Sequence, residues 1–282
     1  MRGRMGRTVF LLSLGAVGLL ALLALLAPWV APYTPQFRGS ELLARPSAAH
    51  FLGTDQQGRD ILTLLLYGGR VALLVGFGAT LLSMLLGIPL GLISGYKGGK
   101  VDAFVMGICE VVFSFPGILL AILLVFITQQ PSVGNVVVAL SATGWAGWAR
   151  LVRGQVLQEK HRDYVLMART AGAGTPRILL HHILPNLASV LLVQFSFAVG
   201  SALLAESSLS FLGLGPQNLP SWGSLLSEGA ALFVCSPWMA TFSGLAIFVS
   251  VLSFNVIGDR LRDRFAQPDL VSATEGGRGP GG

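Results

Sequence analysis

Two adjacent histidines, His181 and His182, are the first residues whose side chains could do chemistry. Imidazole is a common ligand of zinc, but neighbouring positions on a helix point about 100° apart and no third ligand lies nearby in the sequence. No His-Glu-x-x-His motif occurs either. We therefore expect no metal site and no metal-dependent catalysis.

Two acidic residues, Glu110 and Glu206, fall inside or beside long uncharged stretches, where an ionisable group is unfavourable and often functional. They are far apart in the sequence, so no paired set for an intramembrane enzyme is visible. Glu110 lies close to a predicted cytoplasmic interface, and we favour a structural role for it. Glu206 either lines a polar passage or satisfies neighbouring helices. The candidate pathway residues are Gln194, Ser196, Ser201 and Glu206.

The two cysteines carry no redox or metal argument. Cys109 and Cys235 are expected to be buried at opposite leaflets of a membrane, which excludes a disulfide bond. The chain also has no Gly-x-x-x-x-Gly-Lys-Ser/Thr sequence, so we expect it neither to bind nor to hydrolyse a nucleotide. It is predicted to be a non-catalytic protein.

The composition explains this scarcity of reactive groups, because 53% of the residues are hydrophobic and only 11% are charged. A helix of about 20 apolar residues crosses the hydrocarbon core of a bilayer. Long charge-free stretches predict about six such spans, and the polar faces that a soluble helical protein needs are absent. The predicted spans are Val9–Ala31, Arg70–Tyr96, Val101–Thr128, Val133–Ala149, Leu187–Ser208 and Trp238–Ile257.

The resulting fold class is an all-α membrane protein, and its Gly, Ala and Ser content favours a compact bundle. Residues 1–69 would hold the N-terminal tail, first span and outer loop. Residues 70–258 would form a five-helix core, with a turn at 129–132 between its second and third spans. Residues 259–282 would be a cytoplasmic tail whose Gly-rich end is disordered.

The first span resembles a cleavable signal peptide, since three arginines precede an apolar run. That run is long, however, and Pro28-Trp29 stands where a small-residue cleavage site would be expected. We expect a retained helix.

The distribution of basic residues predicts the orientation. With the N-terminus inside, fifteen of the nineteen Lys and Arg residues lie on the cytoplasmic side. The remaining four are Arg38, Arg45, Arg59 and Arg70. Both termini are therefore predicted to be cytoplasmic, and the net charge of +6 is explained by this rule and by anionic lipid rather than by nucleic-acid binding.

One cytoplasmic loop, residues 150–186, is unusually long and basic. Its helical segment is interrupted by Gly172 and Gly174, and Thr175-Pro176 is a typical helix restart with the hydroxyl as cap. Pro185 should end this second element before the fifth span. We expect helix, sharp turn and short surface helix, which either docks on a cytoplasmic partner or is only an amphipathic linker.

The residues of this loop resemble those of the binding-protein-dependent ABC importer permeases, in the branch that imports dipeptides, oligopeptides and nickel. The loop contains Asp163-Tyr164-Val165, Ala168-Arg169, Gly172-Ala173 and the run from His182 to Asn186. It departs from the family signature at Leu166 and Met167, where Glu and Ala are expected, and at His182, which replaces Ile. Further matches extend over nearly the whole chain: Leu52–Asp55, Gly58–Asp60, Gly95-Tyr96, Gly98-Gly99, Asp102, Leu209–Gly215, Pro220–Gly223, Gly258-Asp259 and Leu261–Asp263.

The resemblance is strongest to the second permease of the pair, and it implies a type I importer permease in the inner membrane. In this family the short helix of the loop couples the permease to an ATPase. The resemblance implies a second permease subunit, two ATPase subunits that bind ATP and Mg²⁺, and an extracytoplasmic binding protein. The residues implied to couple are Ala168, Arg169, Gly172, Ala173, Pro176, Leu184 and Pro185.

The outer segments 32–70 and 213–236 are polar enough to receive the binding protein. Asp55, Arg59 and Asp60 are either exposed on this face or joined in internal ion pairs that fix the loop. The cargo is expected to be a peptide, with nickel or another small solute as the alternative. A stand-alone secondary transporter is the alternative of another class, but it would need midplane ion-coupling groups and gives the long loop no role.

Overall fold

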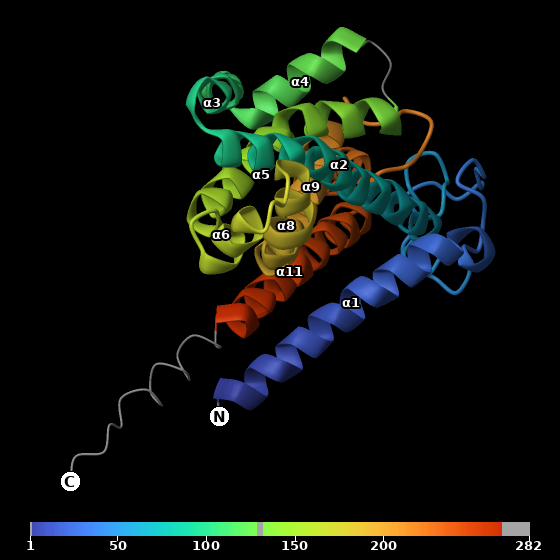
Figure 1. The fold of residues 1–282 in the computed structure, drawn as a ribbon. Coiled ribbons are helices and arrows are strands. Elements are labelled where there is room, and N and C mark those ends of the chain that lie inside the picture. The colour runs from blue at the N-terminus through green and yellow to red at the C-terminus, as the bar shows by residue number, and fades with distance from the viewer. Residues whose placement is uncertain (1, 129–131, 267–282) are drawn as a thin grey trace.

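The computed structural model describes residues 2–128 and 132–266, and it is almost entirely helical over this part of the chain (Figure 1). The predicted turn at 129–131 and the tail 267–282 lie outside the described residues. The helices are α1 (Arg2–Val30), α2 (Ile61–Lys97), α3 (Gly99–Ser114), α4 (Gly117–Thr128), α5 (Val133–Glu159), α6 (Asp163–Thr170), α7 (Thr175–Arg177), the π-helix η1 (Ile178–Ile183), α8 (Leu184–Asn186), α9 (Ala188–Phe211), α10 (Trp222–Ala231) and α11 (Trp238–Ala266).

Among the described residues, four helices are long and apolar enough to cross a membrane, namely α1, α2, α9 and α11. The pair α3 and α4 qualifies together as a fifth candidate, with an 87° bend between its members. The remaining long helix, α5, has 27 residues but carries Arg150 and Arg153 in its second half. The predicted all-α membrane fold is confirmed.

Two predicted spans differ from the structure. Helix α2 begins at Ile61 rather than at Arg70, because the Asp60 carboxylate caps it, accepting a hydrogen bond from Thr63 N at 2.8 Å. The predicted domain boundary at residue 70 therefore falls within a helix. The predicted third span is broken between α3 and α4, where Phe115 adopts an extended conformation before Pro116.

The centre of the bundle is the extensive contact between α2 and α5. Gly87, Gly91 and Gly95 recur every fourth residue on α2 and face α5 directly. A Cβ atom at these positions would lie 2.4 Å from Trp145 O, 2.5 Å from Ala149 O and 2.8 Å from Val156 Cβ, respectively. The two backbones are therefore in van der Waals contact, as small residues permit in membrane helices.

The other long helices surround this pair. Helix α9 packs on α2 and α11, while α1 lies along α2 and α11 at the edge of the bundle (Figure 1). The start of α1, the end of α11 and α6 lie at one end of the bundle, opposite the loop of residues 31–60 (Figure 1).

Candidate outer face, pathway and coupling segment

We call residues 31–60 and 212–237 the outer face; the second range includes α10. Two of its carboxylates, for which exposure was one of the two predicted alternatives, are buried. Asp60 is 2% exposed and Asp55 is 1% exposed. Asp60 also accepts hydrogen bonds from the Thr63 hydroxyl at 2.8 Å and contacts His50 Nδ1 at 3.0 Å. The internal-bonding alternative therefore holds for both carboxylates, because neither is free to contact a partner.

Arg59 joins the loop to α10. Its Nε donates to Asp55 Oδ2 at 2.5 Å, and its Nη2 donates to Glu228 Oε2 at 3.0 Å. Burial raises the pKa of the Glu228 carboxyl; Arg59 opposes this shift and Asp55 adds to it. Glu228 did not emerge from the sequence, since it is 169 residues from Arg59 and belongs to no motif.

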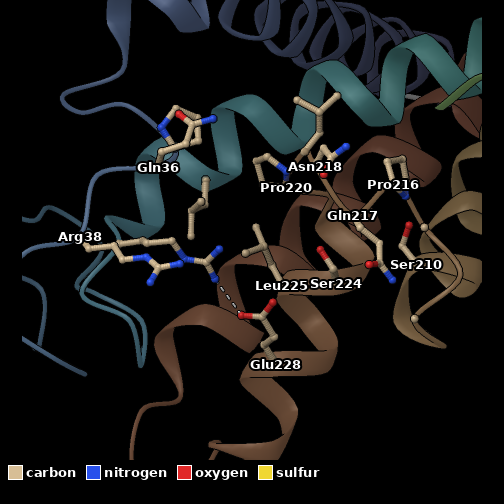
Figure 2. Close-up of a pocket in the computed structure, with 16 residues that line it drawn as sticks. Gln36, Arg38, Ser210, Pro216, Gln217, Asn218, Pro220, Ser224, Leu225 and Glu228 are labelled. Carbon is tan, nitrogen blue, oxygen red and sulfur yellow. Dashed lines mark hydrogen bonds and ion pairs between the residues drawn. The ribbon is translucent and has the colours of Figure 1, made fainter. Parts of the chain in front are cut away.

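A cavity of about 420 Å³ opens at this ion pair. Figure 2 shows Gln36 and Arg38 of the loop on one side, Asn218 and Pro220 on the other, and Glu228 below them. The cavity is lined by both signs of charge, by amides and by hydroxyls, so it suits a polar, charged partner surface.

The predicted pathway residues are separated by the structure. Gln194 and Ser201 of α9 line a cavity of about 280 Å³ together with polar residues of α2 and α5. One of these is Thr80, which is 3% exposed and whose hydroxyl has no hydrogen-bond partner within the described residues. Such an unsatisfied group is unusual in a native core and points to water or a solute in this cavity. Sequence reasoning missed Thr80, Ser83 and Thr143, because isolated hydroxyls in apolar helices are common.

Ser196 and Glu206 do not reach this cavity. The Ser196 hydroxyl bonds to the Leu192 carbonyl of its own helix at 3.3 Å. Glu206 is fully buried and accepts hydrogen bonds from the Ser210 hydroxyl at 2.7 Å and the Ser207 hydroxyl at 3.4 Å. These two residues therefore take the structural role that the sequence left open. Glu110 is exposed on α3.

The coupling segment comprises α6, α7, η1 and α8, and its first helix ends in a Schellman motif. Gly172 has φ +83°, the left-handed conformation that glycine adopts without strain. The amide of Gly172 donates to Arg169 O and the amide of Ala173 donates to Ala168 O, both at 3.0 Å. These two bonds complete the motif and turn the chain sharply, as predicted.

The restart after this turn differs in detail from the prediction. Gly174 occupies the N-cap position, and no side chain caps α7, so the predicted capping by Thr175 is wrong. Pro176 lies in the first turn, where its missing N–H is harmless.

The predicted break at Pro185 is also wrong. Helical hydrogen bonding continues through the π-helix η1, with Leu184 N donating to Leu179 O, and on through Leu187 into α9. A π turn lets a helix absorb a local irregularity such as the missing N–H of proline.

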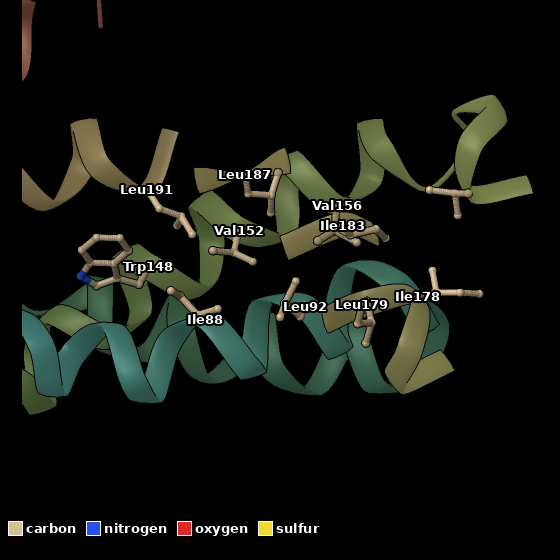
Figure 3. Packing of buried hydrophobic residues seen from close by; sticks show 11 residues of the cluster. Ile88, Leu92, Trp148, Val152, Val156, Ile178, Leu179, Ile183, Leu187 and Leu191 are labelled. Carbon is tan, nitrogen blue, oxygen red and sulfur yellow. The ribbon is translucent and has the colours of Figure 1, made fainter. Parts of the chain in front are cut away.

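The inner side of the coupling segment packs on an apolar surface of α2 and α5, which we call the seat. Val165, Ile178 and Ile183 are at most 1% exposed and pack against Leu92 of α2 and Val156 of α5 (Figure 3). The predicted residues Ala168, Ala173 and Leu184 pack around the same cluster. The segment is thus fixed to the α2–α5 pair rather than suspended on flexible loops.

Two hydrogen bonds support this seat. The Tyr164 hydroxyl donates to Glu159 Oε2 at 2.7 Å, and Lys160 Nζ donates to Gly95 O at 3.1 Å. Burial, aided by the neighbouring Glu159 carboxylate, raises the pKa of Tyr164 to about 12.

The side of the coupling segment that points away from the seat is apolar and open to solvent. Met167 is 64% exposed, Leu180 54% and Leu166 43%. The remaining predicted coupling residues Arg169, Gly172, Pro176 and Pro185 are exposed as well. Arg169 donates to the Tyr96 hydroxyl at 3.1 Å, which holds its guanidinium over the Tyr96 ring. Exposed apolar side chains on a rigid base are typical of a protein interface.

The groups first considered for chemistry remain apart. His181 is exposed and His182 half-buried, and no group of three potential metal ligands forms in residues 2–128 and 132–266. Cys109 is buried, but Cys235 is exposed, contrary to the prediction, because it lies in the turn before α11.

Comparisons with known proteins agree with this architecture. A solved chain of the inward-facing MetNI methionine ABC transporter matches with a TM-score of 0.57 at 16% identity, covering 72% of this chain and 97% of the other, which supports the fold. The glutathione transport system permease protein GsiD of Pectobacterium atrosepticum is 44% identical, over 90% of this chain and 85% of the relative. The dipeptide transport system permease protein DppC of Bacillus subtilis is 41% identical, over 86% of this chain and 77% of the relative.

Two family models match the chain. The N-terminal transmembrane domain of oligopeptide transport permease C covers residues 6–46. The model for the inner-membrane component of binding-protein-dependent transport systems covers residues 87–267, which include the coupling segment, α11 and the α5 and α9 residues that line the 280 Å³ cavity. The chain therefore belongs to the family of inner-membrane components of binding-protein-dependent transport systems, as a multi-pass ABC importer permease.

Proposed function

We propose that this permease imports small peptides as one of two permease subunits in an ATP-driven transporter. The observation that carries the proposal is the coupling segment, whose inner side packs on an apolar seat between α2 and α5 while its opposite side exposes apolar side chains. A force applied to this segment reaches the two central helices directly, because close-packed side chains transmit displacement.

The catalytic step belongs to other subunits in this proposal. The segment would dock on one of two ATPase subunits that bind ATP and Mg²⁺, and this chain would hold no cofactor. Closure of the ATPase pair would move α2 and α5 and thereby change access to the 280 Å³ cavity lined by Thr80, Gln194 and Ser201.

The outer face would receive a substrate-loaded binding protein, while a second permease would complete the pathway as a heterodimer. The charged cavity at Arg38, Arg59 and Glu228 supports docking of a polar surface there. The distribution of basic residues supports an inner-membrane location with both termini in the cytoplasm.

Small peptides are the favoured cargo. The relatives compared above are named for glutathione, which is a tripeptide, and for dipeptide transport. Both cavities are lined by amide and hydroxyl groups that suit a peptide, and the outer one also by charged groups. No cluster of metal ligands occurs among the described residues to favour nickel.

Reconstitution in proteoliposomes tests the proposal. We expect a labelled di- or tripeptide to accumulate only when the partner permease, both ATPases, the binding protein and ATP are present. The variant Thr80→Val keeps the shape of the side chain and removes only its hydroxyl, so it should slow uptake several-fold without loss of assembly. Ser208→Ala, whose hydroxyl bonds within its own helix, is the matched control. Uptake by this chain alone would instead support a secondary transporter.

A further inference from the structure

A groove lies between α2 and the coupling segment, and the mechanism above assigns it no ligand. Its volume is about 510 Å³. Pro89, Leu92 and Ile93 of α2 form one wall, and Leu179 and Leu180 of η1 form the other. Leu92 and Leu179 also belong to the buried cluster of Figure 3, where they lie side by side.

The groove changes from apolar to basic along its length. Pro89 lies two helical turns before Lys97, or about 12 Å at about 1.5 Å per residue. The apolar end therefore lies within the membrane-spanning part of α2, while Lys97 and Thr175 line the cytoplasmic end. An occupant must be apolar where it enters the bilayer and polar at the surface.

The cytoplasmic end carries positive charge. Lys97 is exposed, and no ion pair involves it within the described residues. Arg177, also exposed, directly follows Pro176 of the groove wall. The cytoplasmic leaflet is rich in anionic lipids, and basic pockets between helices on that side bind their headgroups.

We infer that this groove binds an anionic phospholipid of the cytoplasmic leaflet, with an acyl chain beside Pro89 and Ile93 and the phosphate at Lys97. The depth of the groove argues against a peptide segment of a soluble ATPase, which would leave backbone groups unsatisfied in the bilayer. Because its two walls are α2 and η1, a bound lipid would brace the coupling segment against the central helix pair.

Native mass spectrometry of the purified full-length chain tests this inference. The protein is exchanged into detergent with equal amounts of phosphatidylglycerol and phosphatidylcholine, and the lipids that remain bound are counted. We expect preferential retention of phosphatidylglycerol. Lys97→Gln should reduce that retention about fivefold, the effect of one basic group at a membrane surface. Lys100→Gln removes the same charge three residues away, outside the groove, and should have less effect.

A second pair of variants tests the apolar end without changing charge. Ile93→Trp should fill the groove and lower retention, whereas Leu86→Trp on an exposed position of α2 outside the groove should not. Equal retention of both lipids, or equal losses from Lys97→Gln and Lys100→Gln, would overturn the inference. So would a loss of ATPase binding by Ile93→Trp with unchanged phosphatidylglycerol retention, because the occupant would then be a protein.

Discussion

The outer face and the coupling segment are held in place by different interactions. On the outer face, the buried carboxylates of Asp55 and Asp60 bind backbone amides, an imidazole and a guanidinium. The coupling segment instead relies on packing of side chains such as Val165 and Ile183, together with the backbone turn at Gly172.

This difference fits the role proposed for each region. Hydrogen bonds and ion pairs are directional, so they fix the conformation of a loop. Apolar packing is non-directional but nearly incompressible, so a helix seated on it can move as one body with its support. The first property suits the proposed docking surface, and the second suits the proposed transmission of a displacement.

Both regions depend on the α2–α5 pair, so its disruption should have the largest effect. In Gly91→Leu, the new side chain would begin 2.5 Å from Ala149 O and 2.8 Å from Val152 Cβ. We expect a loss of more than about 3 kcal/mol of unfolding free energy, or failure to assemble. Gly107→Leu on α3 meets open space and should be tolerated in the same denaturant titration. A stable Gly91→Leu protein would contradict the close backbone contact.

The next largest effect is expected from aspartates at helix starts, of which each region has one. Asp60→Ala removes a buried cap, so the Thr63 amide loses its acceptor and His50 Nδ1 loses its partner, which should cost about 2 to 4 kcal/mol of unfolding free energy. Asp163→Ala, at the exposed start of α6, should cost less than about 1 kcal/mol. Equal losses in denaturant titrations would show that the two regions are not stabilised differently.

The turn of the coupling segment should respond to backbone conformation rather than to size. A Cβ at Gly172 meets open space, yet φ is +83°. Gly172→Val should therefore strain the turn by about 1 to 3 kcal/mol and abolish stimulation of the ATPase by loaded binding protein. Gly172→Asn, which tolerates this conformation, should retain most of the stimulation. Similar stimulation by both variants would exclude a role for the turn.

The smallest effect is expected at Glu228. Burial raises its pKa above the ordinary 4.5, so the folded protein holds the proton more strongly than the unfolded chain. The stability linked to this group is present at low pH and is lost as the pH rises through the folded-state pKa. Glu228→Gln should remove that loss and change the unfolding free energy by less than about 1 kcal/mol at neutral pH. The prediction would be contradicted if, relative to Glu228→Gln, the wild-type protein became more stable as the pH rises.

The sequence predicted well what depends on local pattern. Charge-free stretches located the long helices, and Gly172 located the turn of the coupling segment. The start of α2 was missed because Arg70 was taken as a boundary, although the apolar run before it already allows a helix from Ile61. The bend at Pro116 had a local signal as well, the proline itself.

Long-range partners could not be predicted in this way. The ion pair of Arg59 with Glu228 joins segments 169 residues apart. The burial of Asp60 could not be predicted either. A polar residue in a polar loop is ordinarily exposed, and only the folded structure shows which residues cover it. The cavity of about 280 Å³ likewise depends on which faces of α2, α5 and α9 meet. Of the four predicted pathway residues, only Gln194 and Ser201 reach it.

The central claim is that the two regions meet different partners, and site-specific photo-crosslinking in the assembled transporter tests it most directly. A photoreactive residue replaces Met167 of α6, which is 64% exposed, or Val234 of the outer face, which is 97% exposed. We expect position 167 to crosslink to an ATPase subunit and position 234 not to do so. An ATPase adduct from position 234, or none from position 167 in an actively transporting complex, would contradict the account.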